Sequence, residues 1–214
     1  MALSGFNPDE VNSSISSVKS AYESLTAAII SRMQNEFVNG MADKWACNNA
    51  QSFFNDQFKP VVDSLINDSN TVFESVVNSM NEAAQAWAQE TNSSYTPTQF
   101  SVNGTKMDVS GILENINGVR GIDLSEADVV AGKLPSIASD ASTALESAKS
   151  AVLNCGFIGG DQASNLQNSL STIKTNIENA TTEITDQVKS AINTTVQNYS
   201  NTQGQIAQAF AGNN

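Results

Sequence analysis

The sequence predicts an all-α protein, an antiparallel four-helix bundle formed by two tandem helical hairpins. Apolar residues recur at helical spacing through four long segments of the 214-residue chain. Two short breaks interrupt them: Trp45-Ala46-Cys47 separates the first segment from the second, and Asn154-Cys155-Gly156 separates the third from the fourth. A short break between long amphipathic helices makes an antiparallel hairpin, and two hairpins bury their apolar stripes against each other.

The first helix is predicted from Asn7 to Ala42. Asn7 is a suitable N-cap, and Pro8 suits the first helical position. The apolar stripe begins with heptad spacing and then continues in four-residue steps. The heptad part is Val11, Ile15, Val18, Tyr22, Leu25 and Ile29, and the later part is Met33, Phe37 and Met41. A helix with one such stripe needs partners that cover it.

The second helix is predicted from Asn48 to Thr91, with its apolar side chains on or near one face. These include Phe54, Phe58, Val61, Leu65, Val72, Val76, Met80 and Trp87. Pro60 interrupts the segment, because proline removes the hydrogen bond to the carbonyl of Asp56. We expect a kink there rather than a helix end, since the apolar stripe resumes in register.

Residues 92–123 lack helical spacing and are rich in Ser, Thr, Asn, Gly and Pro. They are predicted to connect the two hairpins. Alternating residues flank Asn103-Gly104, and both of these residues tolerate the positive φ of a type I′ turn. A small β-hairpin is therefore predicted over residues 99–109. It would have to pack on the helices, because an isolated two-stranded hairpin is only marginally stable.

The third helix is predicted from Ser125 to Leu153, with Pro135 bending or starting it. The fourth is predicted to begin with Asp161 as its N-cap, and its tail from Thr202 to Asn214 is expected to fray. The stripe of the fourth helix again has heptad spacing. The heptad part is Leu166, Leu170, Ile173, Ile177, Ala180 and Ile184, and the stripe continues with Val188, Ala191 and Tyr199.

This layout predicts a first hairpin over residues 1–91, a connector over 92–123 and a second hairpin over 124–214. The two hairpins are expected to pack as one bundle domain. In an antiparallel pairing the two breaks lie at opposite ends of the bundle. Cys47 and Cys155 are then too far apart for a disulfide, so two free thiols are predicted.

The composition excludes several functional classes. The net charge is −12 and the 10 Lys and Arg residues are scattered, so nucleic acid or an anionic membrane finds no basic face. No apolar run is long enough for membrane insertion, and residues 1–10 do not resemble a cleavable signal peptide. The chain has no histidine, which excludes His-based catalysis and His metal sites. We expect no catalytic residue, no cofactor and no metal: the protein is not an enzyme.

The first break resembles the turn of WXG-type proteins, the small substrates of type VII (ESX-like) secretion. That family has Trp-x-Gly between two helices, followed by a small residue and an aromatic residue on the second helix. Trp45, Ala50 and Phe53 match this pattern, and Ala46 takes the variable position. Cys47 stands where the family has Gly.

The second break keeps the other part of the turn. Gly156 has the Gly position, Asn154 replaces the Trp, and Cys155 lies between them. Type VII substrates usually carry Tyr-x-x-x-Asp/Glu after the second helix of the hairpin. Here Tyr199 is followed four residues later by Gln203, which forms a degenerate secretion signal without the acid. Because family members pair into four-helix bundles at half this length, the resemblance implies a tandem pseudo-dimer in one chain.

The resemblance implies a non-enzymatic substrate or accessory protein of a type VII secretion system. Such a protein would be a monomeric pseudo-dimer that acts through protein partners and the secretion machinery. It would be cytoplasmic before export and then secreted or held at the cell surface. The alternative is a flagellin-like structural or surface-filament subunit, a class that also suits helices rich in Asn, Ser, Thr and Ala. Trp45 would either recognise a partner or plug the end of the bundle.

Overall fold

A computed structural model of the chain describes residues 7–155 and 160–211. The chain is mostly helical, at 78%, and has one small antiparallel sheet of two strands. Among the residues described, no helix is both long enough and apolar enough to cross a membrane. The predicted helical class is thus confirmed, whereas the predicted position of the β-structure is wrong.

The first half forms a helical hairpin. Its first arm consists of α1 (Pro8–Thr26), a π-helical segment η1 (Ala27–Val38) and α2 (Asn39–Met41). The strand β1 (Trp45–Ala46) follows, and the second arm consists of α3 (Asn48–Ser52), a π-helical segment η2 (Phe53–Phe58) and α4 (Lys59–Glu90). Asn7 is the N-cap of α1, as predicted, and its side chain accepts a hydrogen bond from the Asp9 N–H at 3.0 Å.

The second half consists of the strand β2 (Gly121–Ile122), α5 (Leu124–Ala131), α6 (Leu134–Asn154) and α7 (Gly160–Ala211). Pro135 lies in the first turn of α6 and so marks a helix start, one of the two predicted alternatives. Two predictions are wrong. Asp161 lies inside the first turn of α7 rather than at its N-cap, and the tail stays helical as far as Ala211.

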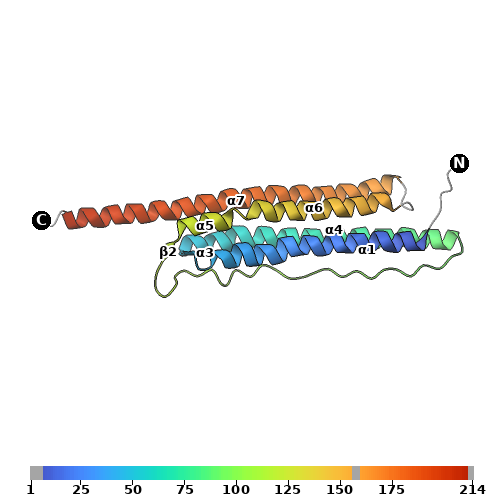
Figure 1. Cartoon of the computed structure of the whole chain (residues 1–214), viewed down its shortest axis with the longest axis horizontal. Helices are drawn as coiled ribbons and strands as arrows, with labels where there is room; N and C mark the ends of the chain where they lie inside the picture. The colour runs from blue at the N-terminus through green and yellow to red at the C-terminus, as the bar shows by residue number, and fades with distance from the viewer. Residues whose placement is uncertain (1–6, 156–159, 212–214) are drawn as a thin grey trace.

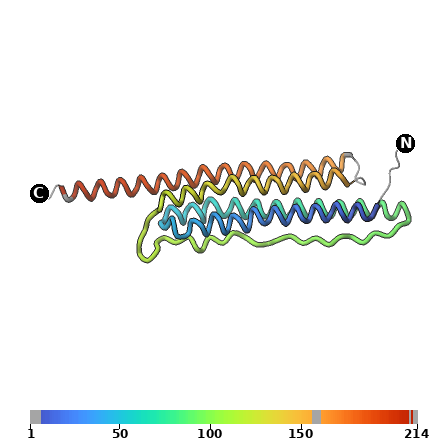
Figure 2. The backbone as a smooth tube through the Cα atoms, viewed as in Figure 1, coloured from blue at the N-terminus to red at the C-terminus, as the bar shows by residue number. Residues whose placement is uncertain are grey.

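The long helices lie side by side in an elongated molecule (Figures 1 and 2). α1 packs against α4 and α6, and α7 packs against α4 and α6. Residues 93–113, which we call the strap, run back along α1 and α4 on the side opposite α6 and α7 in this view (Figure 1). The first hairpin therefore lies between the strap and the second hairpin.

The predicted apolar stripes form one continuous core. Val11, Ile15 and Leu25 of the first stripe are fully buried, as are Ile177 and Ile184 of the last. Burying a Leu or Ile side chain fully contributes about 1.5–3 kcal/mol relative to leaving it exposed. Because these helices carry few strong helix-forming residues on their polar faces, packing of the stripes is their main source of stability.

Both arms of the first hairpin become π-helical close to the Trp45 turn. In η1, Ile29, Met33 and Phe37 follow one another in four-residue steps, and all three are buried. An α-helix has 3.6 residues per turn, so a series of four-residue steps drifts around its axis. A π-helix, with i→i+5 hydrogen bonds, is wider and has more residues per turn, so four-residue steps drift in the opposite sense and offset the drift of the α-helical turns beside it. The drift away from the heptad therefore marks the segment where the helix widens.

Pro60 lies where the second arm returns to α-helical geometry. The Lys59 N–H donates to the Phe54 carbonyl, five residues back, and Pro60 follows in the first turn of α4. The N–H that Pro60 lacks thus falls at the change in hydrogen-bonding pattern. The helix continues across the proline, as the uninterrupted stripe predicted.

The predicted β-hairpin around Asn103-Gly104 is not present; residues 99–109 are extended and have no strand partner. The sheet pairs β1 with β2 instead, with Trp45 opposite Ile122. A two-residue Asn-Gly turn does occur, at Asn117-Gly118, where φ is 53° and 80°. No hairpin forms around Asn103-Gly104 because side chains of the first hairpin bind backbone groups of the strap, which would otherwise pair with a second strand.

Candidate interaction site at the Trp45 turn and the end of α7

The Trp45 turn is held in place by the second half of the chain. β1 pairs with β2, and the Asp123 N–H donates to the Lys44 carbonyl at 2.7 Å. Trp45 is 0% exposed, and Ala46 is also buried. The break between the first two helices is therefore a fixed joint between the two halves of the molecule.

The Trp45 indole packs into a cluster of phenylalanines. Its ring lies 5.9 Å from that of Phe53 and 6.3 Å from that of Phe54, measured between centroids. Phe37 from the opposite arm lies 5.1 Å from Phe58. Tilted and edge-on aromatic pairs of this kind contribute about 0.5–1.5 kcal/mol beyond their buried area. Trp45 is thus a plug that closes this end of the core, which is one of the two predicted interpretations.

Thr195 of α7 contacts three polar side chains of the turn, those of Trp45, Cys47 and Asn49. Its hydroxyl accepts hydrogen bonds from Trp45 Nε1 at 3.3 Å and from Asn49 Nδ2 at 3.2 Å, and it donates to the Ala191 carbonyl at 2.9 Å. Cys47 Sγ lies 3.9 Å from the same oxygen. A hydroxyl has one donor and two acceptor positions, so all the hydrogen-bonding positions of the Thr195 hydroxyl are occupied.

Sequence reasoning missed Thr195. A signal for it exists, because Thr195 follows Val188 by seven residues and so continues the heptad spacing of α7. A polar residue at such a position calls for a hydrogen-bonding partner inside the core. Here the partners are Trp45 and Asn49 of the turn.

A pocket of about 240 Å³ opens beside Thr195. It is lined by Cys47, Asn48, Asn49, Arg120, Thr195, Asn198 and Tyr199. Burial raises the pKa of the Tyr199 phenol, Cys47 raises that pKa further, and Arg120 lowers it. The pocket offers amide, phenol and guanidinium groups for binding.

The second break lies at the other end of the molecule (Figure 1). Asn154 ends α6 and is exposed, whereas Cys155 is buried and its thiol donates to the Val152 carbonyl at 2.8 Å. Burial raises the pKa of the Cys155 thiol from 9.0 to about 11. Gly156 lies outside the described residues. Cys47 and Cys155 are both free and lie at opposite ends, which confirms the prediction of two unpaired thiols.

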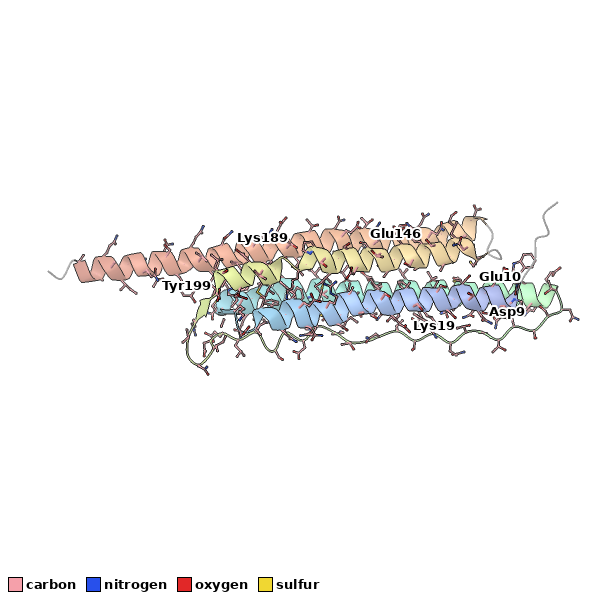
Figure 3. All side chains as sticks on the ribbon, in the orientation of Figure 1. Asp9, Glu10, Lys19, Glu146, Lys189 and Tyr199 are labelled. Carbon is pink, nitrogen blue, oxygen red and sulfur yellow. The ribbon has the colours of Figure 1, made fainter. Side chains whose placement is uncertain are left out.

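α7 continues beyond the Trp45 turn, and no other described part of the chain covers this end of it (Figure 1). Tyr199 lies where the first hairpin ends (Figure 3) and is half-buried. Residues 200–209 are exposed, among them Gln203 and Ile206, whose side chain is 51% exposed. The turn residues and Tyr199 therefore meet at one end of the molecule, and Gln203 lies on a helical projection from it. We call residues 200–211 the α7 projection.

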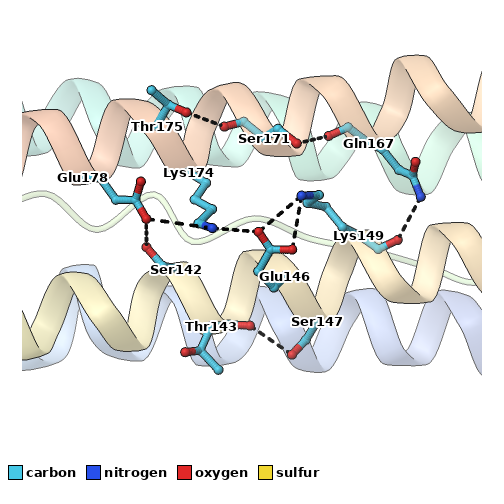
Figure 4. Close-up of polar contacts among 10 residues, drawn as sticks. All are labelled: Ser142, Thr143, Glu146, Ser147, Lys149, Gln167, Ser171, Lys174, Thr175 and Glu178. Carbon is cyan, nitrogen blue, oxygen red and sulfur yellow. Dashed lines mark hydrogen bonds and ion pairs between the residues drawn. The ribbon is translucent and has the colours of Figure 1, made fainter.

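The surface seam between α6 and α7 is held by a network of charged and hydroxyl side chains (Figure 4). Glu146 contacts Lys149 at 3.1 Å and Lys174 at 2.8 Å, and Ser142 donates to Glu178 at 2.9 Å. Hydrogen bonds from Lys174 and Lys149 lower the pKa of Glu146. These half-exposed pairs fix how the two helices lie against each other and contribute little to stability.

Within residues 7–155 and 160–211, no group of three or more Cys, Asp or Glu residues could hold a metal ion. No family model, curated protein or solved structure matches the chain. The candidate site is therefore defined by its own geometry: a sealed turn, a small polar pocket and an uncovered helical projection.

Proposed function

We propose that the protein is a non-enzymatic substrate or accessory protein of a type VII (ESX-like) secretion system. It acts by presenting a folded helical surface to a protein partner. Its two hairpins form one antiparallel four-helix bundle, a single-chain pseudo-dimer of WXG-like halves. The opposite placement of the two breaks and the packing of α1 on α6 and of α7 on α4 support this arrangement.

The α7 projection is the observation that carries the proposal. Most helical stability in proteins comes from packing, so a projecting helical end gains stability when a partner covers it. The projection contains no charged residue, in a chain whose net charge is −12. It begins next to Tyr199 and contains Gln203, the residues that resemble a degenerate secretion signal. A partner that recognises this end would contact an uncharged helix with Ile206 exposed.

The arrangement of reactive groups supports a binding role rather than catalysis. The Cys155 thiol is protonated at neutral pH, because its pKa is about 11, and protonated thiols are poor nucleophiles. Without histidine the chain lacks the usual base that would activate a nucleophile. Surface contacts are then the means by which the protein acts.

Export from a Gram-positive host with an intact type VII system tests the proposal. The full chain should reach the medium only when the ATPase of the system is present. A chain ending at Tyr199 should stay in the cells, while a chain lacking only residues 212–214 should be exported. Equal export with and without the ATPase, or retention of the full chain, would contradict the proposal. Circular dichroism of the truncated protein controls for loss of folding.

A further inference from the structure

The strap is an extended chain that side chains of the first hairpin hold by its backbone. Asn81 of α4 binds both backbone groups of Thr98: its Nδ2 donates to the carbonyl at 3.1 Å, and its Oδ1 accepts from the N–H at 3.0 Å. Lys19 of α1 donates to the Gln99 carbonyl at 3.0 Å. The two helices thus offer an extended chain the kind of hydrogen bonds that a neighbouring strand would offer in a sheet.

Two buried side chains continue this series. The Tyr22 hydroxyl donates to Asn70 Oδ1 at 2.7 Å and accepts a hydrogen bond from the Asn103 N–H. Asn70 Nδ2 donates to the Asn103 carbonyl at 2.7 Å. Tyr22 is 5% exposed and Asn70 is 9% exposed. Buried polar groups need partners, so these two side chains require an extended backbone over them.

The strap is held unevenly along its length. None of the residues 93–106 is buried, whereas Met107, Val109 and Ile112 are. In the first part, Phe100 and Val102 are half-buried and pack against the core, and the Phe100 ring lies 5.1 Å from that of Tyr22. A segment with few buried apolar contacts opens locally at low free-energy cost. Residues 95–103 are therefore held mainly by hydrogen bonds, which a second extended chain can replace, whereas residues 107–112 are anchored by buried apolar side chains.

We propose that the groove between α1 and α4 beneath residues 95–103 is a binding site for an extended segment of a partner polypeptide. The strap is its resident occupant and is displaced when the partner binds. Asn81, Lys19, Tyr22 and Asn70 contact backbone atoms, which any sequence offers. Two contacts are with side chains: Asn81 Oδ1 accepts from the Tyr95 hydroxyl at 2.6 Å, and Asn12 Oδ1 accepts from the Thr98 hydroxyl at 2.8 Å, so hydroxyl groups at these two positions are favoured. This site is distinct from the α7 projection and does not rest on the export route.

The resident segment defines the chemistry of the partner. Residues 93–105 carry no charge, and an acidic segment is disfavoured by the chain's own charge of −12. An aromatic side chain at the Phe100 position and a β-branched one at the Val102 position fill the half-buried sites. A second copy of this chain is a poor occupant, because its strap is tied to its own α4 at one end and to β2 at the other.

A labelled peptide with the sequence of residues 95–109 tests the groove. In the double variant Phe100→Ser, Val102→Ser the tethered strap competes less, so the peptide should bind at least about tenfold more tightly than to the unmodified chain. Lys106→Ser, an exposed change in the strap, should bind like the unmodified chain. A peptide carrying the same two serines should bind the double variant at least about tenfold more weakly.

The residues of the groove are tested in the same double variant. Asn81→Ala should weaken peptide binding by at least about fivefold, because it removes three hydrogen bonds, two to Thr98 and one to the Tyr95 hydroxyl. Asn78→Ala, an exposed asparagine of the same helix, should leave binding unchanged. Failure of the folded double variant to bind, or an equal effect of the two alanine changes, would overturn the proposal.

If the double variant does not fold, hydrogen exchange on the unmodified chain tests whether the peptide displaces the strap. Excess peptide should speed exchange of the Thr98 and Asn103 amides at least about tenfold, because their partners are then occupied. Unchanged exchange at saturating peptide would overturn the proposal. Light scattering distinguishes the two candidate occupants of the groove. A chain that stays monomeric at all concentrations supports a partner polypeptide. A dimer that forms with rising concentration indicates a second copy of the chain and contradicts the proposal.

Discussion

The Trp45 indole donates a hydrogen bond to the Thr195 hydroxyl across 3.3 Å, between residues 150 positions apart in the chain. This bond joins the turn of the first hairpin to the last helix, just before that helix leaves the rest of the molecule. Asn49 donates to the same oxygen, so one threonine satisfies two donors of the turn. The turn therefore fixes the base of the α7 projection.

Replacing Thr195 by Val should destabilise the fold. Valine keeps the shape of threonine but leaves the donors of Trp45 and Asn49 without their acceptor, which costs about 1–3 kcal/mol for a buried polar group. Urea unfolding followed by circular dichroism measures the loss. Thr194→Val is the matched control, because Thr194 is exposed and adjacent. Equal losses for the two variants would show that Thr195 does not organise the turn.

Phe37→Ala should be among the most destabilising single changes. The Phe37 ring contacts Phe53, Phe54 and Phe58 and is fully buried. Truncating a buried phenylalanine costs about 3–5 kcal/mol, because transfer free energy is lost and a cavity remains. Thermal unfolding compares this variant with Phe100→Ala, whose ring is half-buried in the strap. A similar effect of the two changes would argue against the aromatic cluster as the closure of this end.

Asn92 follows the C-cap of α4 and has a left-handed conformation, with φ at 51°. The Ser93 N–H then reaches the Ala88 carbonyl at 2.8 Å and closes the helix end. Asn92→Ala should lower the free energy of unfolding by roughly 1 kcal/mol, since a Cβ without a polar group is disfavoured there. Asn92→Gly should be at least as stable as the unmodified chain. Denaturant melts measure both, and a glycine variant weaker than the alanine variant would refute this geometry.

The Cys155 thiol should lower stability at high pH. Its pKa is raised from 9.0 to about 11 in the folded state, so the unfolded chain loses the proton first as pH rises. Its contribution is complete below pH 9 and is lost as pH rises through about 11. The free energy of unfolding should therefore fall more steeply over this range than it does for Cys155→Ala. Parallel pH profiles for the two proteins would contradict the raised pKa.

Thiol labelling gives a second view of Cys155. In a Cys47→Ser variant, Cys155 is the one remaining cysteine, and its burial should keep it almost unreactive towards iodoacetamide at pH 8. Complete labelling should follow on denaturation. Fast labelling of the native variant would show an open second turn.

Much of the helical framework could be predicted from apolar spacing alone. Val11, Ile15 and Leu25 follow a heptad and are fully buried, because spacing along a helix directly decides which face a side chain occupies. The four-residue steps from Ile29 to Phe37 also carried information, since the helix widens there. In these segments local pattern and tertiary packing favour the same structure.

The strap and the joint at Thr195 could not be predicted in this way. Asn103-Gly104 and Asn117-Gly118 carry the same turn signal, yet only the second forms a two-residue turn. The difference lies in Tyr22 and Asn70, which are remote in sequence and bind the backbone of Asn103. The α7 projection was expected to fray on composition, but an established helix propagates without a new nucleation step.

Binding of the purified chain to the cytosolic ATPase domains of a type VII system tests the proposed function most directly. Titration calorimetry should detect binding of the full chain with a dissociation constant of about 1–10 μM, which corresponds to roughly 7–8 kcal/mol. Ile206→Ser should weaken this binding at least about tenfold, and Leu153→Ser, an exposed change at the opposite end, should not. Absence of binding by the full chain, or equal binding by the two variants, would contradict recognition through the α7 projection.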